Sequence, residues 1–383
     1  MRLRYAMLLI ALIAAPPMRA LGAPADLAAA QKLTRDVCEA MAHRDFKPLL
    51  ELIRKGDIQS ELIARMPEGY PADPKQREEI AGGFMKTIEA GVPQIWSYAP
   101  AAERFLAPPR EEKSVLAVPV RFDSGNKQRA QVTVFQVFRY RASPDGLRLV
   151  NIETPLAGPD LVSSAASLMP AHWPESPADT EKKQRQQTVI VQMMRGSHFE
   201  AEQAARKAMK ESPEDIVFRL ALGRALDSMK KYDDSKELYR DMLARGQAVL
   251  FVHNQLAAQA MAEEHYSEAV THLQAVVDGL PEDDWLLVQL ANAQMLAGKN
   301  AEAKATLERA LKINPLSRHA LEQRARLRIR EGDLDGAAAD LRTVKEHYGQ
   351  NVVTLLKDPD FSKVVLMDKY ADIIDRAVPP KSP

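Results

Sequence analysis

Residues 284–315 read DWLLVQLANAQMLAGKNAEAKATLERALKINP, and this stretch decides the fold of the C-terminal half of the chain. Positions three and four apart share one face of a helix, because each residue turns the chain by roughly 100°. Leu287 and Leu290 therefore mark the buried side of a first helix. Gly298 ends that helix, since glycine accepts the left-handed conformation, and Pro315 ends a second helix, since proline cannot continue one. The stretch predicts a helical hairpin.

The hairpin pattern recurs in both directions at the interval that separates Gly298 from Gly332, which we call the repeat length. The positions that end the first helix are Gly196, Lys230, Glu264, Gly298 and Gly332. The small residues expected where the two helices touch are Ala201, Ser235, Ala269, Ala303 and Ala337. The positions that end the second helix are Pro213, Gln247, Pro281, Pro315 and Gly349. Five units without an insertion thus cover residues 182–351.

This pattern resembles the tetratricopeptide repeat family, whose unit is a helical hairpin of the same length, about 34 residues. The resemblance implies an all-α solenoid of about five helical hairpins. In the last unit Arg324 and Arg328 stand where the middle units are apolar, as is usual for an end unit that faces solvent. Residues 352–383 are expected to form a capping helix and a tail, with an apolar stripe: Phe361, Val364, Val365, Met367, Tyr370 and Ile373.

Residues 1–23 have the layout of a secretory signal peptide. Arg2 and Arg4 precede an apolar run over residues 6–15, and small residues follow between Gly22 and Ala25, where we expect cleavage. The run is too short to span a bilayer in the mature protein. The sequence therefore predicts an exported protein, periplasmic in a Gram-negative cell, with secretion beyond the periplasm as the alternative.

Composition limits the classes of function. Lysine plus arginine and aspartate plus glutamate are both 52, so no strong field attracts nucleic acid. No later stretch is long and apolar enough for stable membrane insertion. Cys38 is the single cysteine and cannot form an intramolecular disulfide. Phosphate loops, serine elbows and paired carboxylates are missing from the sequence, so we expect a non-catalytic protein without a cofactor. No oligomeric state is predicted.

Residues 26–156 predict an α+β domain. The expected helices cover residues 26–46, 47–66 with a break at Gly56, and 77–90. Runs rich in Val, Phe, Tyr and Ile predict antiparallel strands over residues 114–122, 130–141 and 147–153. Helices followed by an antiparallel sheet resemble the NTF2-like (nuclear transport factor 2) and cystatin-like cone folds, which often enclose a pocket. A proline-rich linker over residues 157–181 is expected to join this domain to the repeats.

The resemblance to tetratricopeptide repeats also implies a binding site, because in that family the first helices line a concave groove for a peptide. Carried onto this sequence, the groove residues are Phe251, Asn254, Ala258, Met261, Trp285, Val288, Asn292, Met295 and Leu296, with Arg224 and Asp227 on one side and His319, Glu322, Arg326 and Arg330 on the other. Tryptophan and arginine are favoured anchors, and methionine adapts to varied partners. We expect an apolar floor with a basic end, which suits a peptide with hydrophobic side chains and an acidic group. The family's Lys/Asn clamp for a terminal carboxylate is not found. The alternative is that Trp285 and the methionines pack against the neighbouring repeat.

His265, Glu268 and His272 are the residues nearest to a metal-binding pattern, but zinc needs at least three converging protein groups. The repeat register turns His265 and Glu268 toward solvent, so no metal is expected. The predicted function is an adaptor or assembly factor in the cell envelope that binds a protein or peptide. The alternatives are a small-ligand-binding protein or an enzyme acting through the N-terminal domain.

Overall fold

The structure is a computed structural model that describes residues 24–64, 66, 73–95, 103–106, 109–112, 115–124, 132–153, 155–156, 181, 184–186, 188–189, 192–193, 195–280, 283–348 and 359–374. The chain divides into two compact units, residues 1–153 with 160–166 and residues 154–159 with 167–383. The expected signal peptide and nearly all of the expected linker lie outside the described residues. None of the described helices combines the length and the apolar character of a membrane span.

The described part of the N-terminal unit begins with the helices α2 (Pro24–Ala42), α3 (Lys47–Lys55), α4 (Ile58–Ala64) and α5 (Pro74–Ile95). The predicted break at Gly56 is confirmed, and it separates α3 from α4. A Cβ atom at Gly56 would lie 2.3 Å from the carbonyl oxygen of Leu149, which accepts a 2.8 Å hydrogen bond from the Asp57 backbone N–H. Glycine is therefore required where the helices approach the sheet.

The sheet contains β1 (Glu103–Leu106), β2 (Arg110–Glu112), β3 (Val115–Ser124), β4 (Val132–Ser143) and β5 (Gly146–Glu153), paired antiparallel. The three predicted strands correspond to β3, β4 and β5. The two short strands β1 and β2 were not predicted, because runs of 4 and 3 residues are too short to show an alternation. They pair in succession with the edge of β3 that β4 leaves free.

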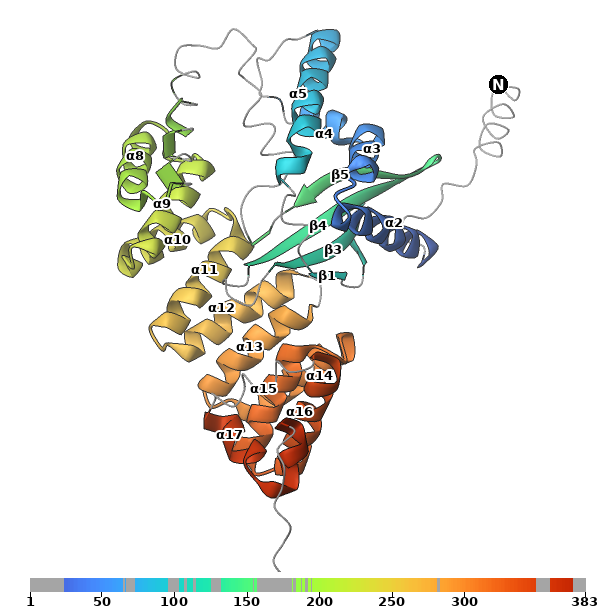
Figure 1. Ribbon diagram of the computed structural model, residues 1–383. Helices are drawn as coiled ribbons and strands as arrows, with labels where there is room; N and C mark the ends of the chain where they lie inside the picture. Colours follow the sequence, from blue (N-terminus) through green and yellow to red (C-terminus); the bar gives the residue numbers. More distant parts are fainter. Residues whose placement is uncertain are drawn as a thin grey trace, which may run out of the picture. The chain divides into compact units, whose positions relative to one another are not determined.

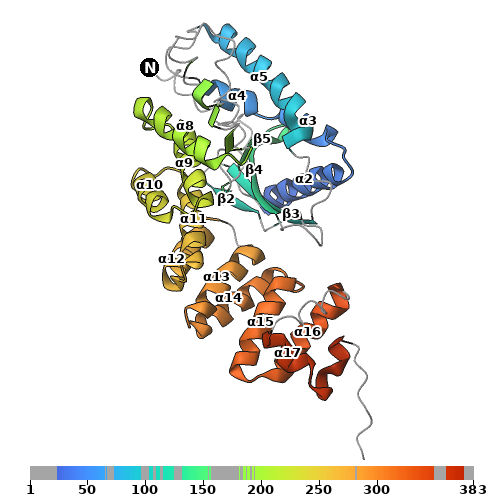
Figure 2. The same ribbon diagram turned by 60° about the vertical axis from the view of Figure 1, so that its left-hand side comes forward.

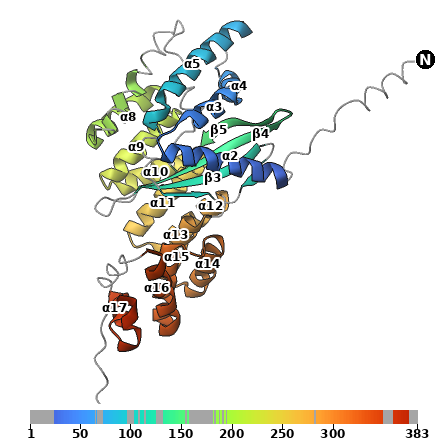
Figure 3. The same ribbon diagram turned by 45° about the vertical axis from the view of Figure 1, so that its right-hand side comes forward.

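Helix α2 lies across β3 in the N-terminal unit (Figure 3). The Thr34 hydroxyl on this helix and the Tyr140 hydroxyl on β4 are 2.7 Å apart and buried. Val118 and Phe138 are register partners on the same side of the sheet as Tyr140, and both are fully buried. Helices first and an antiparallel sheet afterwards confirm the predicted α+β order.

The second unit is an array of paired helices (Figures 1 and 2). Its described helices are α8 (His198–Glu211), α9 (Ile216–Ser228), α10 (Tyr232–Ala244), α11 (Val249–Ala262), α12 (Tyr266–Gly279), α13 (Asp284–Leu296), α14 (Asn300–Ile313), α15 (Arg318–Glu331) and α16 (Leu334–Tyr348). The second helices of successive units begin at His198, Tyr232, Tyr266, Asn300 and Leu334, each one repeat length after the last. The register therefore runs without a slip, as predicted.

The turns inside the units have one geometry. The five helix-ending positions all have positive φ: 72° at Gly196, 57° at Lys230, 62° at Glu264, 75° at Gly298 and 81° at Gly332. The backbone N–H of the next residue then bonds back into the last helical turn, for example from Lys299 to the Gln294 carbonyl at 2.8 Å. This is the Schellman arrangement, and two units keep it without glycine.

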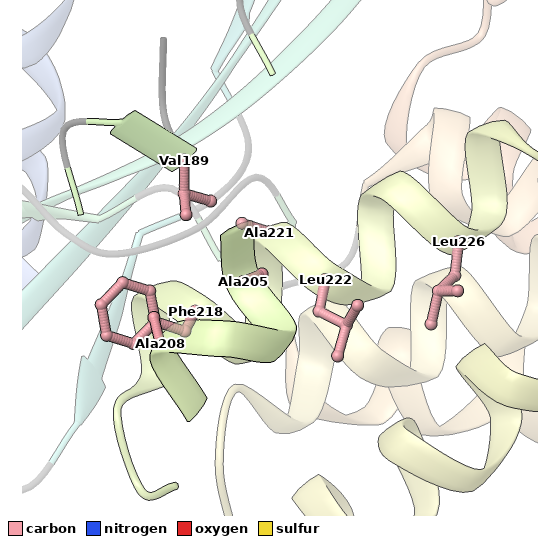
Figure 4. Packing of buried hydrophobic residues seen from close by; sticks show 7 residues of the cluster. All are labelled: Val189, Ala205, Ala208, Phe218, Ala221, Leu222 and Leu226. Atoms are coloured by element: carbon pink, nitrogen blue, oxygen red, sulfur yellow. The ribbon is translucent and has the colours of Figure 1, made fainter. Parts of the chain in front are cut away.

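The small residues of the second helices lie where the sequence predicts close packing. Ala201, Ser235, Ala269, Ala303 and Ala337 are each 0% exposed. Val189 of the first unit packs with Ala205 and Ala208 of α8 and with Phe218 of α9 (Figure 4).

The last unit replaces apolar packing with an ion cluster. Asp340 on α16 has a side chain only 4% exposed, and it accepts bonds from Arg324 at 2.6 and 3.0 Å and from Arg328 at 2.8 Å. The two arginines that depart from the repeat pattern thus bridge the helices of their own unit.

The C-terminal segment forms α17 (Pro359–Val365) and the short helix η4 (Asp368–Ile374), which pack on α15 and α16 as the predicted cap. Of the expected apolar stripe, Met367 is 41% exposed, while the rest is buried: Phe361, Val364, Val365, Tyr370 and Ile373. Helix η4 begins one repeat length after α16, and Ala371 repeats the buried position of Ala337. The cap is therefore a shortened sixth unit in the same register.

Candidate partner-binding face

Helix α13 leaves one narrow stripe of its surface uncovered. Of its 13 residues, 9 are buried, and the others are Trp285, Gln289, Asn292 and Leu296. Their spacing of four, three and four places them in a single line along the helix. Leu296 is 40% exposed, and the other three are half-buried.

The repeat register carries this stripe onto the neighbouring first helices. On α11 the equivalent accessible residues are Gln255, Ala258 and Ala262, and on α15 they are His319, Gln323, Arg326 and Arg330. Together with the α13 stripe we call them the first-helix face. Helices α13 and α15 pack directly against each other, so their two stripes lie side by side.

Three residues of the predicted groove floor lie in the core instead. Phe251 is 1% exposed, Val288 3% and Met295 5%. Side chains buried to this degree offer almost no surface to a partner. Asn254 and Met261 are half-buried and remain accessible in part. The predicted apolar floor is correspondingly narrower.

Phe251 packs in an apolar cluster with Tyr239 and Met242, and Arg224 lies over its ring. The Arg224 guanidinium lies 5.1 Å from the ring centroid, and Tyr239 meets the ring edge-on at 6.2 Å. Burial lowers the pKa of Arg224. One repeat length further along the chain, Trp285 takes the position of Phe251 and Ala258 takes the position of Arg224. The methyl group of alanine can cover much less of an aromatic ring than an arginine side chain can. Trp285 is half-buried, whereas Phe251 is 1% exposed.

Asp227 stabilises the packing between neighbouring units through hydrogen bonds. It accepts a 2.6 Å hydrogen bond from the Tyr239 hydroxyl and another from the Gln259 amide, which also donates to Ser235 at 2.7 Å. Burial raises the pKa of Asp227, and these donors oppose the rise. Its oxygens face α10 and α11, so it is a packing residue.

The predicted basic end has partners inside the chain. The Arg326 guanidinium lies 4.8 Å from the centre of the Phe361 ring, and an Arg330 guanidinium nitrogen is 3.6 Å from a carboxylate oxygen of Asp360. Glu322 accepts from Arg318 at 2.6 Å. The cap thus engages both arginines, although the Arg330 side chain stays 42% exposed. The α13 stripe is the uncharged part of the face.

The histidines of α11 and α12 form a pair. The Nδ1 atoms of His253 and His272 are 2.9 Å apart, and His272 Nε2 lies 3.8 Å from Glu268. Burial lowers the pKa of both imidazoles. His265 lies 3.9 Å from the other oxygen of Glu268. Within the part of the chain that the structure describes, no three metal-ligating side chains converge.

The sequence interpretation missed three glutamines of the face, Gln255, Gln289 and Gln323. Each is half-buried, and the three occupy the same position in successive units. This recurrence is visible in the sequence, but the groove positions of the resembled family are other residues.

Residues 260–327 match the family model described as tetratricopeptide repeat. Among solved structures, the chain is similar to PilF of Pseudomonas aeruginosa, with 21% identity and a TM-score of 0.41 over 52% of this chain and 90% of that chain. It is similar to MamA from Desulfovibrio magneticus RS-1, with 17% identity and a TM-score of 0.40 over 44% of this chain and 97% of that chain. It is also similar to TTC0263, described as a thermophilic TPR protein in Thermus thermophilus. The identity is 18% and the TM-score 0.32, over 49% of this chain and 100% of that chain. No curated protein matches the chain.

Proposed function

Because the C-terminal half of the chain is an array of tetratricopeptide repeats, a scaffold for protein interaction, we propose that its first-helix face holds a segment of a partner protein. The observation that carries this proposal is the α13 stripe. A half-buried tryptophan, two amides and an exposed leucine stand in one line on a helix that is otherwise covered. Such a mixture of aromatic anchor and polar donors is typical of protein-binding surfaces.

The rigid array suits a binding role. In the described part of the array the main helix contacts lie within one unit or join successive units, and the shortened sixth unit packs on the last of them, as in other repeat arrays. A preformed surface loses little conformational entropy when it binds an extended segment. The matched family is one of non-catalytic scaffolds, and we propose no reaction.

We place the protein in the cell envelope, as an adaptor or assembly factor. Support comes from the N-terminal leader pattern, with its basic start, apolar run and small-residue segment. Mass spectrometry of the purified protein's N-terminus tests this location. A mature start between Gly22 and Ala25 is expected, and a retained Met1 would overturn it.

Photo-crosslinking in cells tests the binding face with the full chain. A photoreactive residue replaces Leu296 on the face, Glu308 on the exposed side of α14, or Glu79 on α5 of the N-terminal unit. We expect a discrete protein adduct from position 296 alone, lost when Asn292→Arg is added. Equal adducts from 296 and 308 would refute the face. Adducts from position 79 alone would move the function to the α+β domain.

A further inference from the structure

The hairpin of α11 and α12 contains two histidines in contact, one of them at a core position of the repeat. His253 on α11 stands one repeat length before Leu287 and two before Leu321, which are 0% and 3% exposed. His272 on α12 stands one repeat length before Thr306. Both histidines are part-buried, and their Nδ1 atoms are 2.9 Å apart. In the middle of the array, a titratable pair therefore joins the two helices of one unit.

The short distance is compatible with only some protonation states. A neutral imidazole has one N–H and one acceptor nitrogen, whereas an imidazolium has two N–H groups and no acceptor. Two Nδ1 atoms at 2.9 Å need one donor and one acceptor, so the pair keeps its hydrogen bond with no added proton or with one. When both rings are protonated, two N–H groups point at each other and two positive charges repel. The doubly protonated pair is therefore incompatible with the closed hairpin.

The neighbouring charges favour one added proton at most. Burial and the His253 ring lower the pKa of His272, Glu268 of α12 raises it, and Arg240 of α10 lowers it. Burial also lowers the pKa of His253. Helix α13, which packs on α12, carries one ionisable side chain, Asp284, which accepts a hydrogen bond from α14. Of these neighbours Glu268 alone favours protonation, and it lies 3.8 Å from one ring of the pair.

We propose that His253 and His272 form an acid-sensitive switch in the array: with at most one added proton the pair holds α11 against α12, and a second proton opens this hairpin. Helix α11 carries one stripe of the first-helix face, and α13, which carries the next stripe, packs on α12. Opening therefore separates the two stripes and releases a segment that spans them. The release rests on the proposed function, whereas the opening does not.

Hydrogen–deuterium exchange of the full chain tests the opening, with protection factors compared at about pH 7.5 and about pH 5.0. A histidine that binds its proton only in the open hairpin raises the opening constant about 30-fold over this interval, since its ordinary pKa is about 6.5. We expect the protection of residues 249–279 to fall by about this factor in acid and to recover when the pH is raised. Residues 284–313 contain no histidine and are the internal reference, with little change expected.

Two variants separate the pair from other effects of acid. His253→Leu combined with His272→Thr gives α11 and α12 the residues that the next unit carries at the same positions. His272→Gln keeps a polar partner for His253 and removes the second charge. Both variants are expected to keep their protection in acid. His319→Gln, at an exposed histidine of α15, is the control and leaves the acid effect unchanged. Equal protection of the parent hairpin at the two pH values, or an equal loss in the parent and both variants, overturns the switch.

Photo-crosslinking from position 296, repeated in lysate adjusted to each pH, tests the release. We expect the adduct to disappear in acid with the parent chain and to persist with His272→Gln. An adduct that persists with the parent chain although the hairpin opens overturns the release and spares the proposed function. An acid-opened hairpin without an adduct at either pH removes the proposed function and leaves the switch.

Discussion

Replacing Glu264 with glycine is expected to stabilise the repeat array. Glu264 ends α11 with φ at 62°, in the left-handed region where a Cβ atom crowds the following carbonyl. Gly298 and Gly332 hold the equivalent positions with φ of 75° and 81°. The Glu264 side chain is exposed, so its removal takes no packing from the core.

The size of the effect follows from two opposing terms. The left-handed conformation costs a residue with a Cβ roughly 1–2 kcal/mol. Glycine loses more backbone entropy on folding than glutamate does, which offsets this gain in stability by about 0.5–1 kcal/mol. The net gain for Glu264→Gly is therefore about 0.5–1 kcal/mol, or about 1–4 °C in the melting temperature of an array of this size.

The reverse change supplies a second measurement. A Cβ at Gly298 would meet nothing within 4 Å, so Gly298→Ala tests backbone conformation without a clash. It is expected to destabilise by about the same 0.5–1 kcal/mol. Glu308→Gly is the control, because glycine within α14 costs about 1 kcal/mol and shows that glycine by itself does not stabilise.

Urea unfolding of the full chain, followed by circular dichroism at the helix band, gives these differences as shifts of the midpoint. Glu264→Gly unfolding at or below the parent midpoint, with native helix content, would refute the conformational argument. An unchanged midpoint for Gly298→Ala would do so independently.

Three further outcomes follow from the contacts. Asp340→Ala removes the buried carboxylate that Arg324 and Arg328 share, while Arg328 keeps its bond to the Gly336 carbonyl. It is expected to lower the free energy of unfolding by about 2 kcal/mol, less than the roughly 3–5 kcal/mol of a fully buried pair; a thermal melt checks it, and Asp340→Glu is the charge-keeping control. His253 and His272 have lowered pKa values in the fold, so stability is full above about pH 6.5 and falls as the pH drops below that value toward the lowered pKa values. Urea midpoints at neutral and mildly acidic pH measure the fall, which should shrink in the double variant with glutamine at both positions; an equal fall would contradict it. Tyr140→Phe is expected to cost about 1 kcal/mol by removing the buried bond to Thr34, and a double-mutant cycle with Thr34→Val that gives no coupling would exclude that cause.

Much of the repeat fold was predictable because it is encoded locally. The left-handed turns, the small residues at contact positions and the helix starts all recur once in every unit, and each has a local physical cause. The same holds for the break at Gly56 and for the three long strands. Strands β1 and β2 were missed because their pairing with β3 is a long-range contact that leaves no pattern in so few residues.

The residues of the proposed binding face were predicted only in part. The repeat register identified Trp285, Asn292 and Leu296 as surface residues, but it also assigned Phe251, Val288 and Met295 to the groove. Helical spacing alone cannot tell which equivalent positions a neighbouring unit covers. Arg224 over Phe251 and the cap over Arg326 are contacts between units.

The sequence by itself therefore determined the period, the hairpin unit and the direction in which each helix faces, since these depend on residues within a few turns of one another. Only the tertiary structure decided which of those facing residues remain accessible. Accessibility depends on the side chain that an adjacent unit places beside each position, and that side chain differs from unit to unit: an arginine covers Phe251, whereas an alanine stands in the equivalent place beside Trp285. The same holds for the charge of α15, because Asp340 of α16 and Asp360 of α17 pair with its arginines.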